Sequence, residues 1–199
     1  MNSAPPAADP TPAPRNGRLS AEDWAQAALD LIAEQGVAAV AVEPLARRLG
    51  VTKGSFYWHF PSRDALLQAA LERWETFEQE AVFGTLEAVP DPRERLRALF
   101  QVVGHEVKPH VVYSELLKAL DHPAVQPVID RVSQRRLDYL IASFRQAGMD
   151  RTQAQHRARL TYAAYVGFLQ LSLQLQQPKL THEEFEAYLA HVIDTLIPA

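Results

Sequence analysis

The stretch 53–60, KGSFYWHF, combines residue types that suit contact with double-stranded DNA. In a helix, Phe56 and Phe60 lie four residues apart on one face, which we assign to the core. The Tyr-Trp-His run at 57–59 is then left with apolar bodies and polar tips that point outward beside Lys53. Hydroxyl and imidazole groups can bind phosphates, and an aromatic face can pack on a thymine methyl group.

Each of these residues also has an ordinary structural alternative. Trp58 alone is as compatible with the core as with the surface, and Tyr57 and His59 could cap the end of their own helix. Three such residues in succession, within a basic stretch, favour DNA contact. The small side chain of Ser55 fits near base edges, and Gly54 lets the backbone approach closely.

The charge distribution supports the same interpretation. The chain of 199 residues has a net charge of -4, which argues against a generally basic nucleic-acid coat protein. Residues 64–199 carry 14 basic and 18 acidic side chains, whereas residues 44–63 contain no acid. A local basic patch on an acidic body predicts one site that meets phosphate. Its four charges are Arg47, Arg48, Lys53 and Arg63.

Short helices must position this stretch. Ser20 is placed to cap a first helix with Asp23 three residues later, and Gly36 ends that helix. A second helix fits 42–49, and Thr52 is placed to cap the third, which we expect to run to residue 60. Ser62 is placed to cap a fourth helix at 63–83.

The rest of the chain shows only helical periodicity. Prolines or glycines separate the segments, no stretch alternates like a strand, and the fold class is all-α. Residues 1–17 contain five prolines and few large apolar side chains, which predicts a disordered tail that ends near Arg15 and Arg18. The expected helices are 93–106, 111–120, 124–147, 151–176 and 182–196.

Several classes of protein are excluded or disfavoured. The chain has no cysteine, so disulfides, thiolate nucleophiles and sulfur-ligated metals are excluded. Its apolar run at 162–175 is interrupted by polar residues and is too short to span a membrane. His105-Glu106 has no second histidine at the spacing of a zinc protease, and no Gly-rich loop or nucleophile elbow occurs. We therefore expect no enzyme activity, cofactor, metal or signal peptide, and a cytoplasmic location.

The segment 45–67, LARRLGVTKGSFYWHFPSRDALL, strongly resembles the DNA-binding head of tetracycline-repressor-type (TetR-like) transcriptional regulators. The resemblance covers about residues 18–78, which we call the head, with its helix-turn-helix at about 41–60; residues 79–199 are the body. It implies that the third helix enters the major groove. Ala41-Val42 replace the Thr or Ser that often begins the second helix, so Arg47 and Arg48 are candidate substitutes for that phosphate contact. The expected DNA-binding residues are Arg47, Arg48, Thr52, Lys53, Gly54, Ser55, Tyr57, Trp58, His59 and Arg63.

For the body, the resemblance implies a helical regulatory and dimerisation domain that binds a small effector. An aromatic stripe is often plain core, and His105 and His110 are the best polar candidates for orienting a ligand. The candidate effector-binding residues are Trp74, Phe77, Phe100, Val103, His105, His110, Tyr113, Leu117, Tyr139, Tyr162, Tyr165 and Phe168. A stripe on 151–176 either pairs two protomers or is internal core. The candidate dimer-interface residues are Leu160, Ala164, Gly167, Phe168, Leu171, Tyr188 and Val192.

The resemblance implies a homodimeric repressor that binds a palindromic operator in double-stranded DNA and is released by a small molecule, with no membrane partner. One alternative is an activator of the same family. Another is an all-helical ligand-binding protein whose head meets a protein partner. Salt distinguishes DNA from protein as the partner, because operator affinity falls steeply with ionic strength.

Overall fold

The computed structural model describes residues 19–84, 86, 88–105 and 107–197, so the expected tail at 1–17 lies outside the described residues. Within this part of the chain no strand forms, and the all-α prediction is confirmed. A short 3-10 helix (Val37–Ala39) and a π-helical segment (Gln79–Gly84) accompany the α-helices. The α-helices are α1 (Ala21–Gln35), α2 (Val42–Arg48), α3 (Lys53–Phe56), α4 (Arg63–Glu78), α5 (Pro92–His105), α6 (Val107–Leu117), α7 (Gln126–Gln146), α8 (Arg151–Gln174) and α9 (His182–Leu196).

The predicted helix starts in the head are largely confirmed. Ser20 Oγ accepts from the Asp23 backbone N–H at 3.2 Å, and Asp23 Oδ2 accepts from the Ser20 N–H at 2.8 Å, which completes a capping box. Ser62 Oγ accepts from the Ala65 N–H at 3.1 Å and begins α4. Thr52 occupies the N-cap position of α3, but its side chain makes no capping hydrogen bond.

Three predicted boundaries are wrong. The third helix ends at Phe56, and turns continue the chain to Phe60, whose N–H donates to the Phe56 carbonyl at 3.0 Å. α4 is α-helical only to Glu78, where the π-helical segment takes over. α6 begins at Val107 and contains Pro109 in its first turn, where a missing N–H costs no helical hydrogen bond.

The head has a compact aromatic core. The Phe56 ring lies edge-on to Trp24 at 5.4 Å and stacks on Phe60 at 5.8 Å. The same cluster of buried residues continues into the body through Leu116 of α6 and Val128 of α7. α1 packs on both α4 and α6, so head and body share one apolar core.

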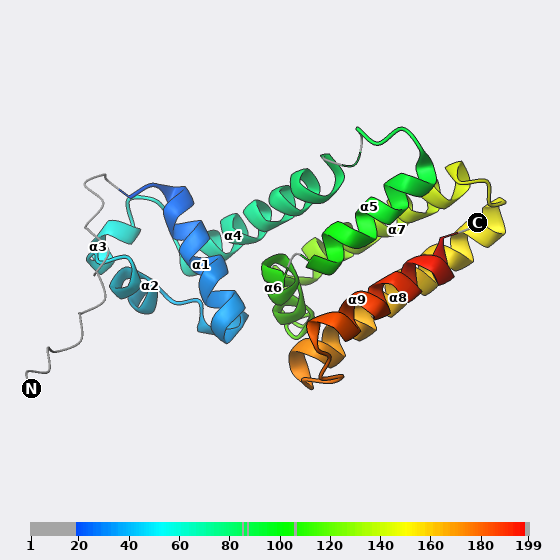
Figure 1. The fold of residues 1–199 in the computed structure, drawn as a ribbon. Coiled ribbons are helices and arrows are strands. Elements are labelled where there is room, and N and C mark those ends of the chain that lie inside the picture. The colour runs from blue at the N-terminus through cyan, green and yellow to red at the C-terminus, as the bar shows by residue number, and fades with distance from the viewer. Residues whose placement is uncertain (1–18, 85, 87, 106, 198–199) are drawn as a thin grey trace, which may run out of the picture.

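In the body, α7 packs on α8, and α5 packs on both α7 and α9 (Figure 1). A second core cluster, which includes Leu96, Phe144, Ala158 and Ile193, holds these helices together. α4 extends from the head and packs on α7. Among the described residues, no helix is long and apolar enough to cross a membrane.

Candidate DNA interface and effector cavity

The candidate DNA interface lies on α3 and the turns that follow it. Phe56 is fully buried, whereas the side chains of Tyr57 and Trp58 are 57% and 79% exposed. This agrees with the faces expected from the sequence. His59 and Ser55 are half-buried, and Thr52, Lys53 and Gly54 are exposed. An aromatic pair that is largely exposed, with Tyr57 touching the core only edge-on at Phe56, therefore lies beside a cation on the surface.

Two of the expected cations are paired with acids from outside the acid-free stretch. Lys53 Nζ donates to Glu43 Oε1, and the carboxylate raises the pKa of Lys53. Arg48 makes two 2.6 Å hydrogen bonds to Glu34, whose carboxylate likewise raises the pKa of Arg48. Arg47 is exposed, and among the described residues it makes no ion pair. Folding thus neutralises part of the patch, and DNA phosphates would compete with Glu34 and Glu43 for these cations.

Arg63 has a different environment from the other expected DNA contacts. Its Nε donates to the Val40 carbonyl at 2.9 Å, and Nη2 donates to the Val37 carbonyl at 3.2 Å. Its Nη1 lies 3.0 Å from Asp64 Oδ1 and 3.2 Å from His122 Nε2. Arg63 therefore fixes the segment between α1 and α2 and joins the head to the body.

A cavity of about 430 Å³ lies between α5, α7, α8 and α9 in the body. Most of its wall is apolar, and its size falls in the range of small-molecule sites. Seven of the candidate effector-binding residues line it: Phe100, Val103, His110, Tyr139, Tyr162, Tyr165 and Phe168.

The other candidate residues lie elsewhere. Trp74 and Tyr113 are buried and stack on each other with ring centroids 6.0 Å apart. Leu117 packs against the core cluster shared by head and body, and Phe77 is 53% exposed. His105 is exposed and lies 2.9 Å from a Glu186 carboxylate oxygen. A hydrogen bond to the Gln101 carbonyl and the Glu186 carboxylate raises the pKa of His105.

Hydrogen bonds fix the aromatic side of the cavity. His110 Nε2 lies 2.7 Å from the Val103 carbonyl, which can only accept, so Nε2 carries a proton. In the neutral ring, Nδ1 then accepts from the Tyr165 hydroxyl at 2.7 Å. The Tyr162 hydroxyl donates to Ser133 Oγ at 2.9 Å and lies 2.5 Å from the Tyr113 hydroxyl. Burial raises the pKa of Tyr113 and of Tyr165, so both phenols are neutral at physiological pH.

Sequence reasoning missed a charged pair in the cavity wall. Arg136 Nη2 donates to Glu78 Oε2, and Glu78 is only 4% exposed. The Arg136 guanidinium carbon lies 4.4 Å from the Tyr113 ring centroid and 5.5 Å from that of Tyr165. Burial disfavours the charge on Arg136, but the oxygens of Tyr165 and Glu78 outweigh it and raise its pKa.

A signal for this pair was present in the helical spacing. Glu78 follows Trp74 by four residues and so continues the buried stripe of α4. Arg136 follows Val132 by four residues and Leu140 follows Arg136 by four, so the charge lies within the buried stripe of α7. A charge at a position where a stripe requires an apolar residue predicts a buried, paired group.

The candidate dimer-interface residues divide between the surface and the cavity. Leu160 of α8 is 58% exposed, and Gly167 and Leu171 are exposed on the same side of the helix. Ala164 and Tyr188 are exposed and also line the cavity. Phe168 and Val192 line it as well, and the Phe168 ring stacks on Tyr188 at 4.9 Å. α8 and α9 thus enclose one side of the cavity while showing an apolar face to solvent.

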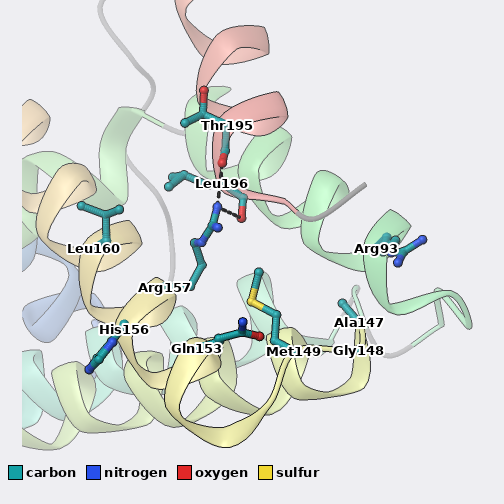
Figure 2. A pocket seen from close by; sticks show the side chains of 10 residues that line it. All are labelled: Arg93, Ala147, Gly148, Met149, Gln153, His156, Arg157, Leu160, Thr195 and Leu196. Carbon is teal, nitrogen blue, oxygen red and sulfur yellow. Dashed lines mark hydrogen bonds between the residues drawn. The ribbon is translucent and has the colours of Figure 1, made fainter.

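A second hollow of about 730 Å³ lies where α7 turns into α8, beside the end of α9 (Figure 2). The guanidinium of Arg157 points into it and donates to the carbonyls of Thr195 at 2.7 Å and Leu196 at 3.2 Å. These bonds satisfy carbonyls that α9 leaves without helical partners. Arg93, His156 and other lining residues are exposed. Because most of its lining side chains are exposed, we take the more apolar cavity between α5, α7, α8 and α9 as the candidate ligand site.

Similarity to known proteins supports both the assignment of the head as a DNA-binding domain and the fold of the chain. The family described as bacterial regulatory proteins, tetR family, matches residues 26–70. The nucleoid occlusion factor SlmA of Marinobacter nauticus is 31% identical over 86 residues, which are 43% of this chain and 42% of that protein. This match therefore spans less than half of SlmA.

Longer matches include the body. The transcriptional regulator BetI of Klebsiella pneumoniae is 28% identical over 182 residues, which cover 86% of this chain and 91% of that protein. The crystal structure of a putative transcriptional regulator from Saccharomonospora viridis in complex with choline has a TM-score of 0.76 at 21% identity. That match covers 87% of this chain and 95% of the other and shows a shared fold. With its exposed helix-turn-helix, the head of this chain matches the DNA-binding domain of the tetR family at residues 26–70, and the whole chain is similar in sequence and fold to TetR-type transcriptional regulators.

Proposed function

We propose that this protein is a cytoplasmic repressor that binds a palindromic operator as a homodimer and leaves it when a small molecule enters the body. The observation that carries the DNA contact is the exposed Tyr57–Trp58 pair beside Lys53. Aromatic side chains of this size are normally buried in a head this small, so their exposure favours a binding role. The other contacts in this proposal come from Arg47, Arg48, Thr52, Gly54, Ser55 and His59.

For the homodimer, the supporting feature is the exposed apolar face of α8. Leu160 and Leu171 lie on it with Ala164 and Gly167 between them, and small residues allow close approach of two helices. A second copy of the chain would cover this face, and dimers match the two-fold symmetry of a palindromic operator. Leu171→Glu should convert the dimer to monomers in analytical ultracentrifugation and weaken operator binding.

The cavity between α5, α7, α8 and α9 supports release by an effector. α4 begins at the head, packs on α7, and ends at Glu78 in the cavity wall. A molecule in the cavity therefore meets the helix that continues from the DNA-binding segment. Such a molecule reduces operator affinity only if it binds the DNA-free conformation more tightly than the DNA-bound one.

Selection from random duplex DNA tests the proposal. We expect the purified protein to enrich an inverted repeat, with an affinity that falls steeply between 50 and 200 mM salt. A matched Tyr57→Ala/Trp58→Ala protein should enrich none while remaining folded. Absence of a repeat, even after bound ligands are removed by unfolding and refolding, would contradict the repressor assignment.

A further inference from the structure

The Glu78–Arg136 pair has unused hydrogen-bonding capacity in the cavity. Within the part of the chain that the structure describes, Glu78 Oε1 and Arg136 Nη1 are buried and have no hydrogen-bond partner. The other oxygen and nitrogen of the same groups bond to each other. Both residues belong to the cavity lining, which therefore contains one acceptor and one donor without a partner, and burial makes each costly to leave unpaired.

The remaining polar side chains of the wall carry hydroxyl groups, apart from the His110 imidazole. Thr161 Oγ1 and Ser172 Oγ are also buried without a hydrogen-bond partner among the described residues. Aromatic and aliphatic side chains such as Phe100, Leu140 and Phe185 make up most of the surface. The cavity has room for on the order of 14 water molecules, which suits a small organic molecule.

A charged ligand fits this wall poorly. Glu78 and Arg136 already neutralise each other, so a third charge in an apolar cavity would be left uncompensated. The Arg136 guanidinium already lies over the rings of Tyr113 and Tyr165, so the cation that these two rings accommodate belongs to the protein itself. An anion at Arg136 Nη1 would lie beside the Glu78 carboxylate and be repelled by it.

We propose that the effector is an uncharged, mainly apolar molecule with a polar group that can donate to Glu78 Oε1 and accept from Arg136 Nη1. An alcohol, a phenol or a primary amide has this property. The inference deepens the proposed function, since it names the chemical class of effector for that same cavity. Because Glu78 is the last residue of α4, the polar group of the ligand contacts the helix that leads from the head.

A series of probes with one apolar body tests the chemical class. Calorimetry at pH 7.5 on the full chain, without DNA, compares 4-phenylbutanamide with 4-phenylbutanoate and 4-phenylbutylammonium. We expect the amide to bind at least about tenfold more tightly than either ion. Equal or tighter binding of an ion would overturn the proposal, and so would binding of none of the three.

Variants then test the two residues. In Glu78→Leu/Arg136→Met both charges are removed together, which avoids a lone buried charge. The amide should lose its advantage over butylbenzene in this protein and keep it in the control Arg131→Met, whose side chain lies outside the cavity on the same helix. A preserved advantage in the double variant would overturn the proposal.

The two proposals fail in different ways. The probe series uses the unaltered chain, so it does not depend on how the variant folds, and it measures ligand binding alone. Selection of an operator from random DNA measures DNA binding alone. If the protein enriches an inverted repeat but binds one of the ions more tightly than the amide, the proposed repressor function stands and only the proposal of an uncharged effector is rejected.

Discussion

Replacing Trp58 and its buried neighbour Phe56 separately by alanine should separate binding from stability. Trp58 is 79% exposed, so it buries only about 40 of the 150–250 Å² typical of a buried aromatic side chain. At about 25 cal/mol per Å² this is worth ~1 kcal/mol, which lowers the melting temperature of a chain of this size by about 2–4 °C. Phe56 is fully buried against Trp24 and Phe60, and its removal should cost about 3–5 kcal/mol.

For DNA binding, we expect Trp58→Ala to have a large effect although its effect on stability is small. Trp58→Ala should remain folded by circular dichroism and lose about tenfold or more in operator affinity, measured by fluorescence anisotropy, because one contact to a base is worth ~1–3 kcal/mol. Operator affinity within twofold of the unaltered protein would refute the role of the exposed aromatic face. A melting temperature as low as that of Phe56→Ala would refute the assignment of Trp58 to the surface.

Three further substitutions test the ion pairs of Lys53 and Glu75 and the carbonyl hydrogen bonds of Arg63. Glu43→Gln frees Lys53, so affinity for random duplex should rise about two- to fivefold and its logarithmic salt slope should steepen by about 1 in anisotropy titrations. Arg63→Lys cannot reproduce the two carbonyl contacts of the guanidinium and should cost about 1–3 kcal/mol in thermal denaturation; an unchanged melting temperature would contradict this. Hydrogen bonding to Arg131 holds the pKa of Glu75 below its ordinary 4.5, so its stabilisation is present above that value and is lost as pH falls through the depressed pKa. Glu75→Gln should therefore flatten the fall of melting temperature between pH 6 and pH 3, and an identical fall would show that the pairing does not contribute.

Local features of the head could be predicted because short-range chemistry determines them. The Ser20–Asp23 capping box depends on residues three apart, and the burial of Phe56 and Phe60 follows from their four-residue spacing. The end of α3 was harder to predict, because turns after Phe56 keep nearly the same curvature as a helix.

Long-range partners could not be predicted from spacing along the chain. Glu78 and Arg136 lie on different helices and are 58 positions apart in the chain, and each carries a charge that is normally solvated. The 3.6-residue period indicates that both lie on buried stripes, but it does not show which partner each side chain meets. For the same reason the carbonyl partners of Arg63, which are 23 and 26 positions away, could not be predicted from its place in the chain.

The apolar core that joins α1 to α6 has a consequence for protein engineering. A hybrid repressor that takes its DNA-reading segment from this chain and its sensing segment from a relative would be joined near residue 78. Such a junction cuts through one continuous set of buried side chains, from Trp24 through Trp74 to Leu116. The donor segment would then meet a foreign α6, with mismatched volumes at the seam. A functional hybrid therefore needs the head to be transferred together with the residues of α6 and α7 that pack against it.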